Sequence, residues 1–444
     1  MWATVKGHAQ CVETLLTHDA EAQVVAADSG SFTALMWATL RLTGHVKCMT
    51  ALLAHAAAEE VRAVHDQGRT ALMKATCAES TTQHCWCTLR MCRWRSRCAP
   101  RTSTVALMLV ARAGYIKCVE ALLAHHSKVC AVDNVNTNAL MFAALIGHTQ
   151  CVTALLQQHH ETQVRAADHH GVNALTLAAH SGHVRCVVLL LQHYPEVQVC
   201  AVNKQGKNAL VLVAEAGRAE CAEALLTLRA GEQVSVADQG GHTALMWAVI
   251  NGHAACAVTL LQQLSEVQVC AVNRNRLNAL MLAPAAGQAS CVEVLLAHHA
   301  EAQVRAVDEV STTALIWAVK KGRAKCVQVL LQWHSDVQVC AVDHSSLKNA
   351  LMLAVEAGHV NCSTALLMHD AAAQVRAVDR SGRNALMLAA VSGQVQCVTT
   401  LLRQHAHVQL TALDDMRMNA LTLAMTNNLD DQCIAMLLTS QPSP

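Results

Sequence analysis

Apolar and polar residues along this chain follow a pattern that recurs at a nearly fixed interval. The dipeptide Ala-Leu repeatedly opens an apolar segment, and most of the intervals between copies are 35 residues. The leucines are Leu35, Leu72, Leu107, Leu140, Leu175, Leu210, Leu245, Leu280, Leu315, Leu351, Leu386 and Leu421. Such self-similarity indicates a chain built from one repeated supersecondary unit.

One copy, which begins at Asn138, predicts the elements of the unit. The Asn138 side chain can accept a hydrogen bond from the free amides of the next turn, which favours a helix start. Gly147 can adopt the left-handed conformation that ends this first helix. A second helix is predicted from about residue 149, where apolar residues stand at i, i+4 spacing. Val164 and Ala166 then alternate with polar residues ahead of Asp168, which predicts a short extended segment and a turn.

This unit resembles the ankyrin repeat. The family's Thr-Pro-Leu-His motif corresponds here to Asn/Thr-Ala-Leu-Met, and the Ala-Ala, Gly-His and Leu-Leu pairs stand at matching offsets. The usual glycine after the second helix is absent, and about two extra residues precede the aspartate. The resemblance implies a mainly α fold, a solenoid of helix-turn-helix repeats with β-hairpin fingers, and the departures imply longer, more strand-like fingers.

The repeats account for nearly the whole sequence. We expect a partial repeat at 1–30, a repeat at 31–67, a degenerate and poorly packed or disordered repeat at 68–103, nine repeats of about 35 residues over 104–416, a C-terminal capping repeat at 417–440 and a tail at 441–444. Because Met1 falls inside a first helix, we expect either that sequence is missing upstream or that the chain starts without the polar cap that solenoids need. Pro284 interrupts another first helix and is expected to kink or shorten it, at about 3 kcal/mol.

Composition and charge narrow the function. Tyr and Phe occur twice each, so thin, uniform layers suit the chain better than one large core. The formal net charge of +1 gives no overall electrostatic footprint for nucleic acid or an anionic membrane. No long uncharged apolar run and no signal-like N-terminus stand out. We expect a cytoplasmic monomer that does not bind membranes.

The sequence contains 21 cysteines, many of them in H-x-x-C pairs such as His148/Cys151 and His253/Cys256. Helices of adjacent repeats pack about 8–10 Å apart, whereas thiolates that share a zinc ion each lie about 2.3 Å from it. That separation also exceeds the reach of a disulfide. We therefore interpret the column as small buried hydrophobic residues and predict no metal and no cofactor.

The stretch HCWCTLRMCRWRSRC at residues 84–98 departs from the repeat. Its cysteines lack C-x-x-C spacing, which disfavours a zinc motif. Two other interpretations are a basic patch over residues 90–101, for nucleic acid or a targeting receptor, and a repeat translated out of frame.

The residue after the Met position of each first helix forms the most informative column. By resemblance to the family, it faces a concave groove beneath the fingers and forms an apolar stripe with aromatic anchors. The predicted partner-binding residues in this column are Trp37, Phe142, Leu177, Leu212, Trp247, Leu282, Trp317, Leu353 and Leu388. Alternatively, longer fingers fold down and cover the column as extra core. The fingertip residues predicted to tune specificity are His170, Lys204, Arg274, Glu309, His344 and Arg380.

Motifs of enzymes are missing from the sequence. We find no phosphate-binding glycine loop and no G-x-S-x-G, and the recurring aspartates occupy a turn position. We expect a non-catalytic scaffold that binds partner proteins through the groove and fingers. The alternative is a fragment or adaptor arm of a larger protein, such as a kinase- or ligase-linked array, whose active domain is absent from this chain.

Overall fold

The computed structural model describes most of the chain after residue 101. The described residues are 3, 6, 8–17, 102–124, 132–133, 135–158, 164–193, 201–227, 230–263, 269–298, 303–339, 342–343, 346–369, 371–427 and 431–440. The expected repeat at 31–67, nearly all of the degenerate repeat and the 84–98 stretch lie outside them. The chain divides into two compact units, 1–213 with 224–228 and 214–223 with 229–444.

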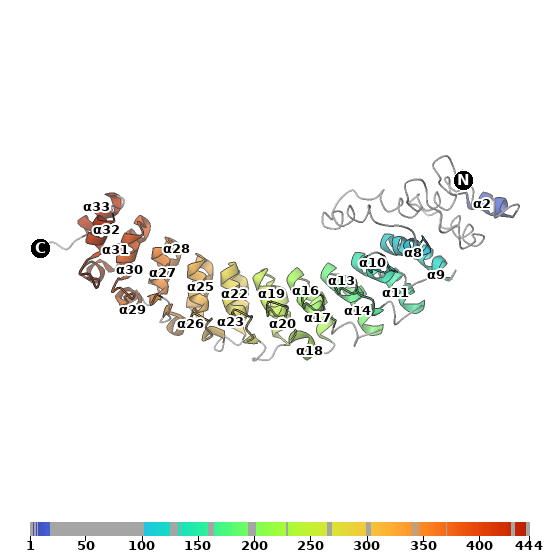
Figure 1. Ribbon diagram of the computed structural model, residues 1–444, viewed down its shortest axis with the longest axis horizontal. Helices are drawn as coiled ribbons and strands as arrows, with labels where there is room; N and C mark the ends of the chain where they lie inside the picture. The colour runs from blue at the N-terminus through green and yellow to red at the C-terminus, as the bar shows by residue number, and fades with distance from the viewer. Residues whose placement is uncertain are drawn as a thin grey trace. The chain divides into compact units, whose positions relative to one another are not determined.

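The first unit is a double row of short helices (Figure 1). Its helices are α2 (Ala9–Leu16), α8 (Thr102–Ala113), α9 (Ile116–Ala124), α10 (Ala139–Ile146), α11 (Thr149–Gln158), α13 (Ala174–Ser181) and α14 (Val184–His193). The first helices α8, α10 and α13 pack in one row, and the second helices α9, α11 and α14 pack in another. The boundary between the units falls within α16 (Ala209–Ala216) and α17 (Ala219–Leu226).

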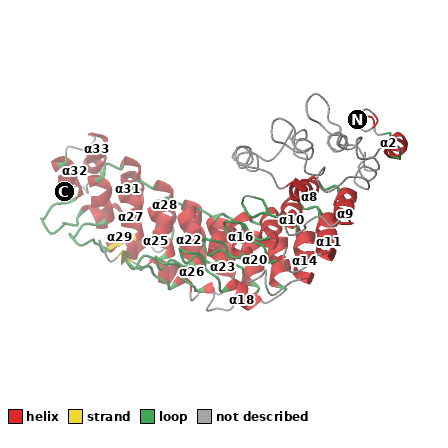
Figure 2. Ribbon diagram, turned by 45° about the vertical axis from the view of Figure 1, so that its right-hand side comes forward, coloured by secondary structure: helices red, strands yellow, loops and turns green. Residues whose placement is uncertain are grey.

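The second unit repeats the same double row. Its first helices are α19 (Ala244–Ile250), α22 (Ala279–Ala286), α25 (Ala314–Lys320), α27 (Ala350–Glu356), α30 (Ala385–Val391) and α32 (Ala420–Thr426), each packed on the next. Its second helices are α20 (Ala254–Leu261), α23 (Ala289–Ala297), α26 (Ala324–Val339), α28 (Val360–Leu367), α31 (Val395–Leu410) and α33 (Asp431–Thr439). The expectation of a mainly α repeat fold is confirmed (Figure 2).

Each repeat buries one face of both helices. In α23, Cys291, Val292, Leu295 and Leu296 are all buried, at the i, i+4 spacing that the sequence predicts. A fully buried leucine or valine side chain contributes about 1.5–3 kcal/mol by its removal from water. Because each layer is one helix thick, this burial depends on the neighbouring repeats.

The predicted extended segment after the second helix is wrong for most of the second unit. Residues there form the short helices α18 (Ala230–Val234) and α29 (Ala371–Arg376), or prolong α26 and α31 to 16 residues. Gln303 and Val304 show the physical reason, because these adjacent residues are both buried. A strand would place neighbouring side chains on opposite faces.

Strands are therefore shorter than expected in the fingers. Among the described residues, one two-stranded antiparallel sheet forms. It consists of β1 (Val342–Asp343) and β2 (Lys348–Asn349), with Val342 opposite Asn349. An isolated bridge joins Ala237 to Thr243. The expectation of longer, more strand-like fingers is wrong there, because helix takes up the preceding residues.

Pro284 does not shorten its helix. The helix α22 keeps eight residues, as α10 and α13 do. Downstream amides close its last turn, since Gly287 N–H and Gln288 N–H both donate to the Ala283 carbonyl. The expected shortening is wrong because the proline removes one amide while these later bonds hold the end of the helix.

Each finger turns around an aspartate or asparagine. Asp308 is typical, because its Oδ1 accepts hydrogen bonds from Val310 N–H at 3.0 Å and Thr312 N–H at 2.8 Å. The same bonds form at Asp133, Asp168, Asn203, Asp238, Asn273, Asp379 and Asp414. The predicted turn role is confirmed for the aspartates at these positions.

Ser311→Gly should stabilise the chain by about 0.5–1 kcal/mol, because Ser311 occupies a left-handed turn position at φ 61°. Gly241 holds the same position in another finger, where a Cβ would lie 2.9 Å from Arg274 N. The matched change Gly241→Ala should therefore destabilise. Urea unfolding of the full chain measures both changes. A loss of stability in Ser311→Gly would contradict the claim that the backbone at Ser311 is strained.

Candidate partner-binding face

The two tryptophans of the column are held by the fingers above them. Trp247 Nε1–H donates to Asp238 Oδ2 at 3.0 Å, and Trp317 Nε1–H donates to Asp308 Oδ2 at 3.1 Å. Both indoles are half-buried. Since the ring N–H is already satisfied, the exposed part of each indole offers carbon surface to a partner.

Charged and polar groups lie beside these rings. The His242 ring is 5.5 Å from the Trp247 ring, and Lys321 Nζ lies 5.9 Å from the centre of the Trp317 ring. Burial alone would raise the pKa of the Asp238 carboxyl, but hydrogen bonds from His242, Trp247 and Gly240 outweigh it and hold that pKa below its ordinary value. Asp238 therefore stays ionised and keeps its tryptophan in place.

The rest of the column is unevenly exposed. In the first unit, Phe142, Leu177 and Leu212 are half-buried; in the second unit, Leu353 is half-buried. Leu282 and Leu388 are only 9% and 4% exposed, so they offer almost no surface and serve as core. At these two positions, the alternative prediction that the column is covered as extra core is therefore correct. Trp37 lies outside the described residues.

The predicted fingertip residues are exposed where the structure describes them. These are His170 and Lys204 in the first unit, and Arg274, Glu309 and Arg380 in the second, while His344 lies outside the described residues. Backbone bonds join neighbouring tips: Lys204 N–H donates to the His170 carbonyl at 2.8 Å, and Arg274 N–H to the Gly240 carbonyl at 3.1 Å. These hydrogen bonds hold the tips of neighbouring fingers next to each other.

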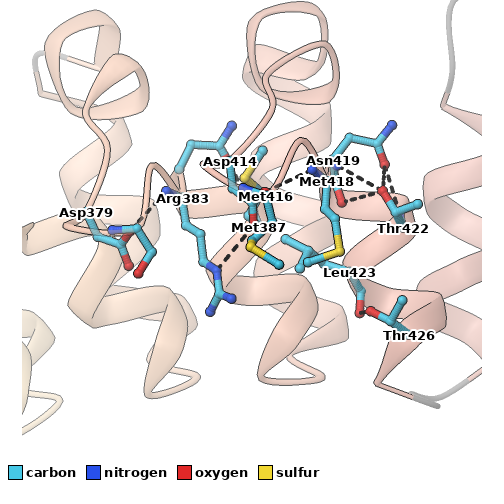
Figure 3. Close-up of polar contacts among 12 residues, drawn as sticks. Asp379, Arg383, Met387, Asp414, Met416, Met418, Asn419, Thr422, Leu423 and Thr426 are labelled. Atoms are coloured by element: carbon cyan, nitrogen blue, oxygen red, sulfur yellow. Dashed lines mark hydrogen bonds and ion pairs between the residues drawn. The ribbon is translucent and has the colours of Figure 1, made fainter.

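Ion pairs fix several charges of the second unit. Lys320 Nζ lies 2.8 Å from Asp343 Oδ2, and Lys348 Nζ lies 2.6 Å from Glu356 Oε1. Arg383 reaches from its finger to the buried Asp414 of the next finger, with 3.6 Å between Nε and Oδ2 (Figure 3). The Asp343 and Asp414 side chains are buried, so removing the lysine or arginine partner would leave a buried carboxylate without its counter-charge.

A protein-family model described as ankyrin repeats in three copies matches nearly the whole chain. The matches cover residues 1–87, 107–201, 196–271, 260–343, 334–414 and 351–443. The chain belongs to the ankyrin-repeat family. No curated protein matches it. Ankyrin repeats generally act as protein-interaction modules and are typically non-catalytic. In the described part of the chain, no helix is long and apolar enough to cross a membrane.

The histidines of the H-x-x-C pairs clamp one ankyrin repeat to the preceding one. His148 Nε2–H donates to the Arg112 carbonyl at 2.9 Å, and His253 Nε2–H donates to the Glu215 carbonyl at 3.2 Å. Each ring packs over the glycine that ends the preceding first helix. Sequence reasoning treated these histidines only as candidate metal ligands, although their recurrence after Gly was a signal for inter-repeat contact.

The cysteine column is part of the core. The buried members, none of them in a disulfide, are Cys151, Cys186, Cys221, Cys256, Cys291, Cys326, Cys362, Cys397 and Cys433. Among the described residues, no group of three potential metal ligands occurs. The interpretation as small buried hydrophobic residues is confirmed for these nine.

Alkaline pH should destabilise the chain through this column. Burial raises the pKa of Cys256, Cys326 and Cys362 to about 11, above the value of about 8.5 for an exposed thiol. The folded state therefore favours the protonated thiols, and the free energy of unfolding should fall as pH rises from about 8.5 toward 11. Urea unfolding at several pH values measures this, and Cys326→Val should make the dependence shallower. An unchanged slope in the variant would contradict the assignment.

One exposed feature of the fingers escaped the sequence analysis. The residue before the turn aspartate or asparagine is an exposed aliphatic side chain at Val272, Val307, Val378 and Leu413. The recurring Ala-Val-Asp/Asn tripeptide was its signal, but alternation suggested that these valines were part of a strand.

Proposed function

We propose that this ankyrin-repeat chain is a non-catalytic scaffold that binds partner proteins through its first helices and fingers. In the second unit, the surface consists of Trp247, Trp317 and Leu353, with Arg274, Glu309 and Arg380 at the fingertips. We call this surface the recognition face. In the first unit, Phe142, Leu177, Leu212, His170 and Lys204 hold the corresponding positions.

One observation carries the proposal: the two indole N–H groups are bound to finger aspartates, while part of each ring stays exposed. A rigid aromatic side chain whose polar group is already satisfied costs little to bury against a partner. The hydrogen bonds also fix the rings, which lowers the entropy that is lost on binding.

The proposal includes no catalytic activity, metal or cofactor. The recurring carboxylates support this view because they bind backbone amides in the finger turns, and the recurring thiols support it because they are core. We further propose a cytoplasmic monomer. Buried cysteines that form no disulfide fit a reducing compartment.

Affinity capture from cells tests the recognition face. We expect the double variant Trp247→Ala/Trp317→Ala to recover the partner at least about tenfold less well than the unchanged chain, because tryptophan anchors often contribute 2 kcal/mol or more each. Trp333→Ala is the matched control, since Trp333 is 51% exposed on α26 and lies outside the column.

A second variant separates binding from folding. Leucine occupies the column in other repeats, so Trp247→Leu/Trp317→Leu should keep the helical content while still weakening capture. Far-UV circular dichroism checks the fold of each variant. Recovery of the same proteins at the same yield with all baits would rule out the recognition face.

A further inference from the structure

The fingers of the second unit expose a regular row of aliphatic side chains. The row consists of Val272 (49% exposed), Val307 (40%), Val378 (52%) and Leu413 (57%), one in each of four fingers, and we call it the aliphatic row. Between Val307 and Val378, Val342 holds the same position and is half-buried. Single exposed valines are ordinary on a protein surface, but here an apolar side chain recurs at one position of successive repeats.

Backbone hydrogen bonds keep these fingers side by side. Arg380 N–H donates to the Ser346 carbonyl at 3.4 Å, and Asp415 N–H donates to the Ser381 carbonyl at 3.2 Å. The Arg383–Asp414 ion pair links the same two fingers as the second of these bonds (Figure 3). These bonds fix the spacing of the fingers that carry Val342, Val378 and Leu413.

Positive charge flanks the aliphatic row. The exposed arginines on these fingers are Arg274, Arg276, Arg380 and Arg417, whereas the exposed acidic residues are Glu309 and Asp415. No ion pair joins the four arginines to any other residue in the part of the chain that the structure describes. These guanidinium groups are open to carboxylates of another molecule.

We propose that the aliphatic row and its arginines bind an acidic, extended peptide segment of a partner protein. The inference rests on the proposed function and adds the chemistry of the partner. Neighbouring repeats are about 8–10 Å apart, and an extended chain of the polyproline-II type has about three residues per turn and advances about 3.1 Å per residue. Every third residue of such a peptide therefore points to the same side and meets one finger. That residue is apolar, and the residues between carry carboxylates. A strip one residue wide suits an extended chain better than the broad apolar stripe of a helix.

Fluorescence anisotropy with the full chain and three labelled synthetic peptides tests this inference. The probes are (Val-Asp-Ser)5, a scrambled peptide of the same composition, and (Val-Lys-Ser)5. We expect (Val-Asp-Ser)5 to bind at least about tenfold more tightly than either other peptide, because charge and spacing both contribute.

Variants assign the binding to the fingers. We expect Arg274→Glu/Arg380→Glu to weaken (Val-Asp-Ser)5 about tenfold and to strengthen (Val-Lys-Ser)5, and we expect Val272→Ser/Val378→Ser to weaken (Val-Asp-Ser)5 about tenfold. Arg403→Glu in α31 and Met368→Ser after α28 are matched controls, because both residues are exposed away from the fingers. Each control variant should bind (Val-Asp-Ser)5 as tightly as the unchanged chain does.

The inference is overturned if (Val-Asp-Ser)5 does not bind, if the scrambled peptide binds equally well, or if the finger variants behave like the controls. Its failure differs from failure of the proposed function. If the tryptophan variants lost capture but no acidic peptide bound, the proposed recognition face would still be supported and only the inference about the peptide would fail.

Discussion

Asn278→Ala should lower the free energy of unfolding by about 2–4 kcal/mol. The Asn278 side chain is fully buried and makes two bonds that no alanine can replace. Its Oδ1 accepts from Met281 N–H at 2.9 Å, which caps the first helix, and its Nδ2 donates to the Gln303 carbonyl at 3.1 Å. Alanine would leave a buried donor and a buried acceptor without partners.

Threonine at the same position is the matched comparison. Thr313 caps its helix through a longer bond of 3.4 Å from Ile316 N–H, and threonine has no amide group to reach a carbonyl such as that of Gln303. We therefore expect Asn278→Thr to cost about 1–2 kcal/mol, less than alanine. Asn275→Ala, on an exposed fingertip, should stay within about 0.5 kcal/mol. Urea unfolding measures all three, and equal costs for Ala and Thr would contradict the double role of Asn278.

Gly217→Ala should cost about 2–3 kcal/mol, because two separate penalties meet at this glycine. Its backbone is left-handed at φ 71°, and a Cβ would lie 2.5 Å from His253 Nδ1. The histidine ring would have to move, and the bond from His253 Nε2–H to the Glu215 carbonyl would weaken.

A double-mutant cycle separates the two penalties. His253→Ala removes the obstructing ring, so Gly217→Ala should cost less in that background, by about 0.5–1 kcal/mol. Gly231→Ala is the control, since it lies in the helix α18 and an added Cβ would meet no atom within 4 Å. That change should stabilise by about 0.5–1 kcal/mol. Strict additivity of Gly217→Ala and His253→Ala would show that the ring does not oppose the Cβ.

The features of the fold that were predicted correctly from sequence depend on chemistry local to a few residues. Asn138 and Thr243 cap helices as expected because a side-chain oxygen two or three residues from a free amide acts within one turn. Gly147 ends its helix in the left-handed conformation, as its position predicts. The apolar i, i+4 pattern likewise defined the buried face of the second helices.

The helical conformation of Gln303 and Val304 was not predictable from the residues around them. Four residues of alternating polarity fit a strand, whereas in the structure the Gln303 carbonyl accepts a hydrogen bond from the side-chain amide of Asn278, 25 residues earlier in the sequence. A pattern search within a short window does not detect such a contact.

The candidate face was only partly predictable for the same reason. The column was identified from its composition, yet Leu282 and Leu388 are buried while Trp247 and Trp317 keep part of their surface. Exposure depends on how neighbouring fingers cover each position, which one repeat does not encode. The bond between Trp247 and Asp238 spans nine residues and requires the finger to fold back over its own helix.

The central claim is that each repeat is stabilised by its immediate neighbours. Equilibrium unfolding of single and double variants tests it most directly. Leu280 and Leu315 lie in the packed helices α22 and α25, whereas Leu386 lies in α30, which is separated from α25 by α27. We predict a coupling energy of about 0.5–3 kcal/mol between Leu280→Ala and Leu315→Ala, and additivity within about 0.5 kcal/mol between Leu280→Ala and Leu386→Ala. Equal coupling in the two pairs would contradict the claim.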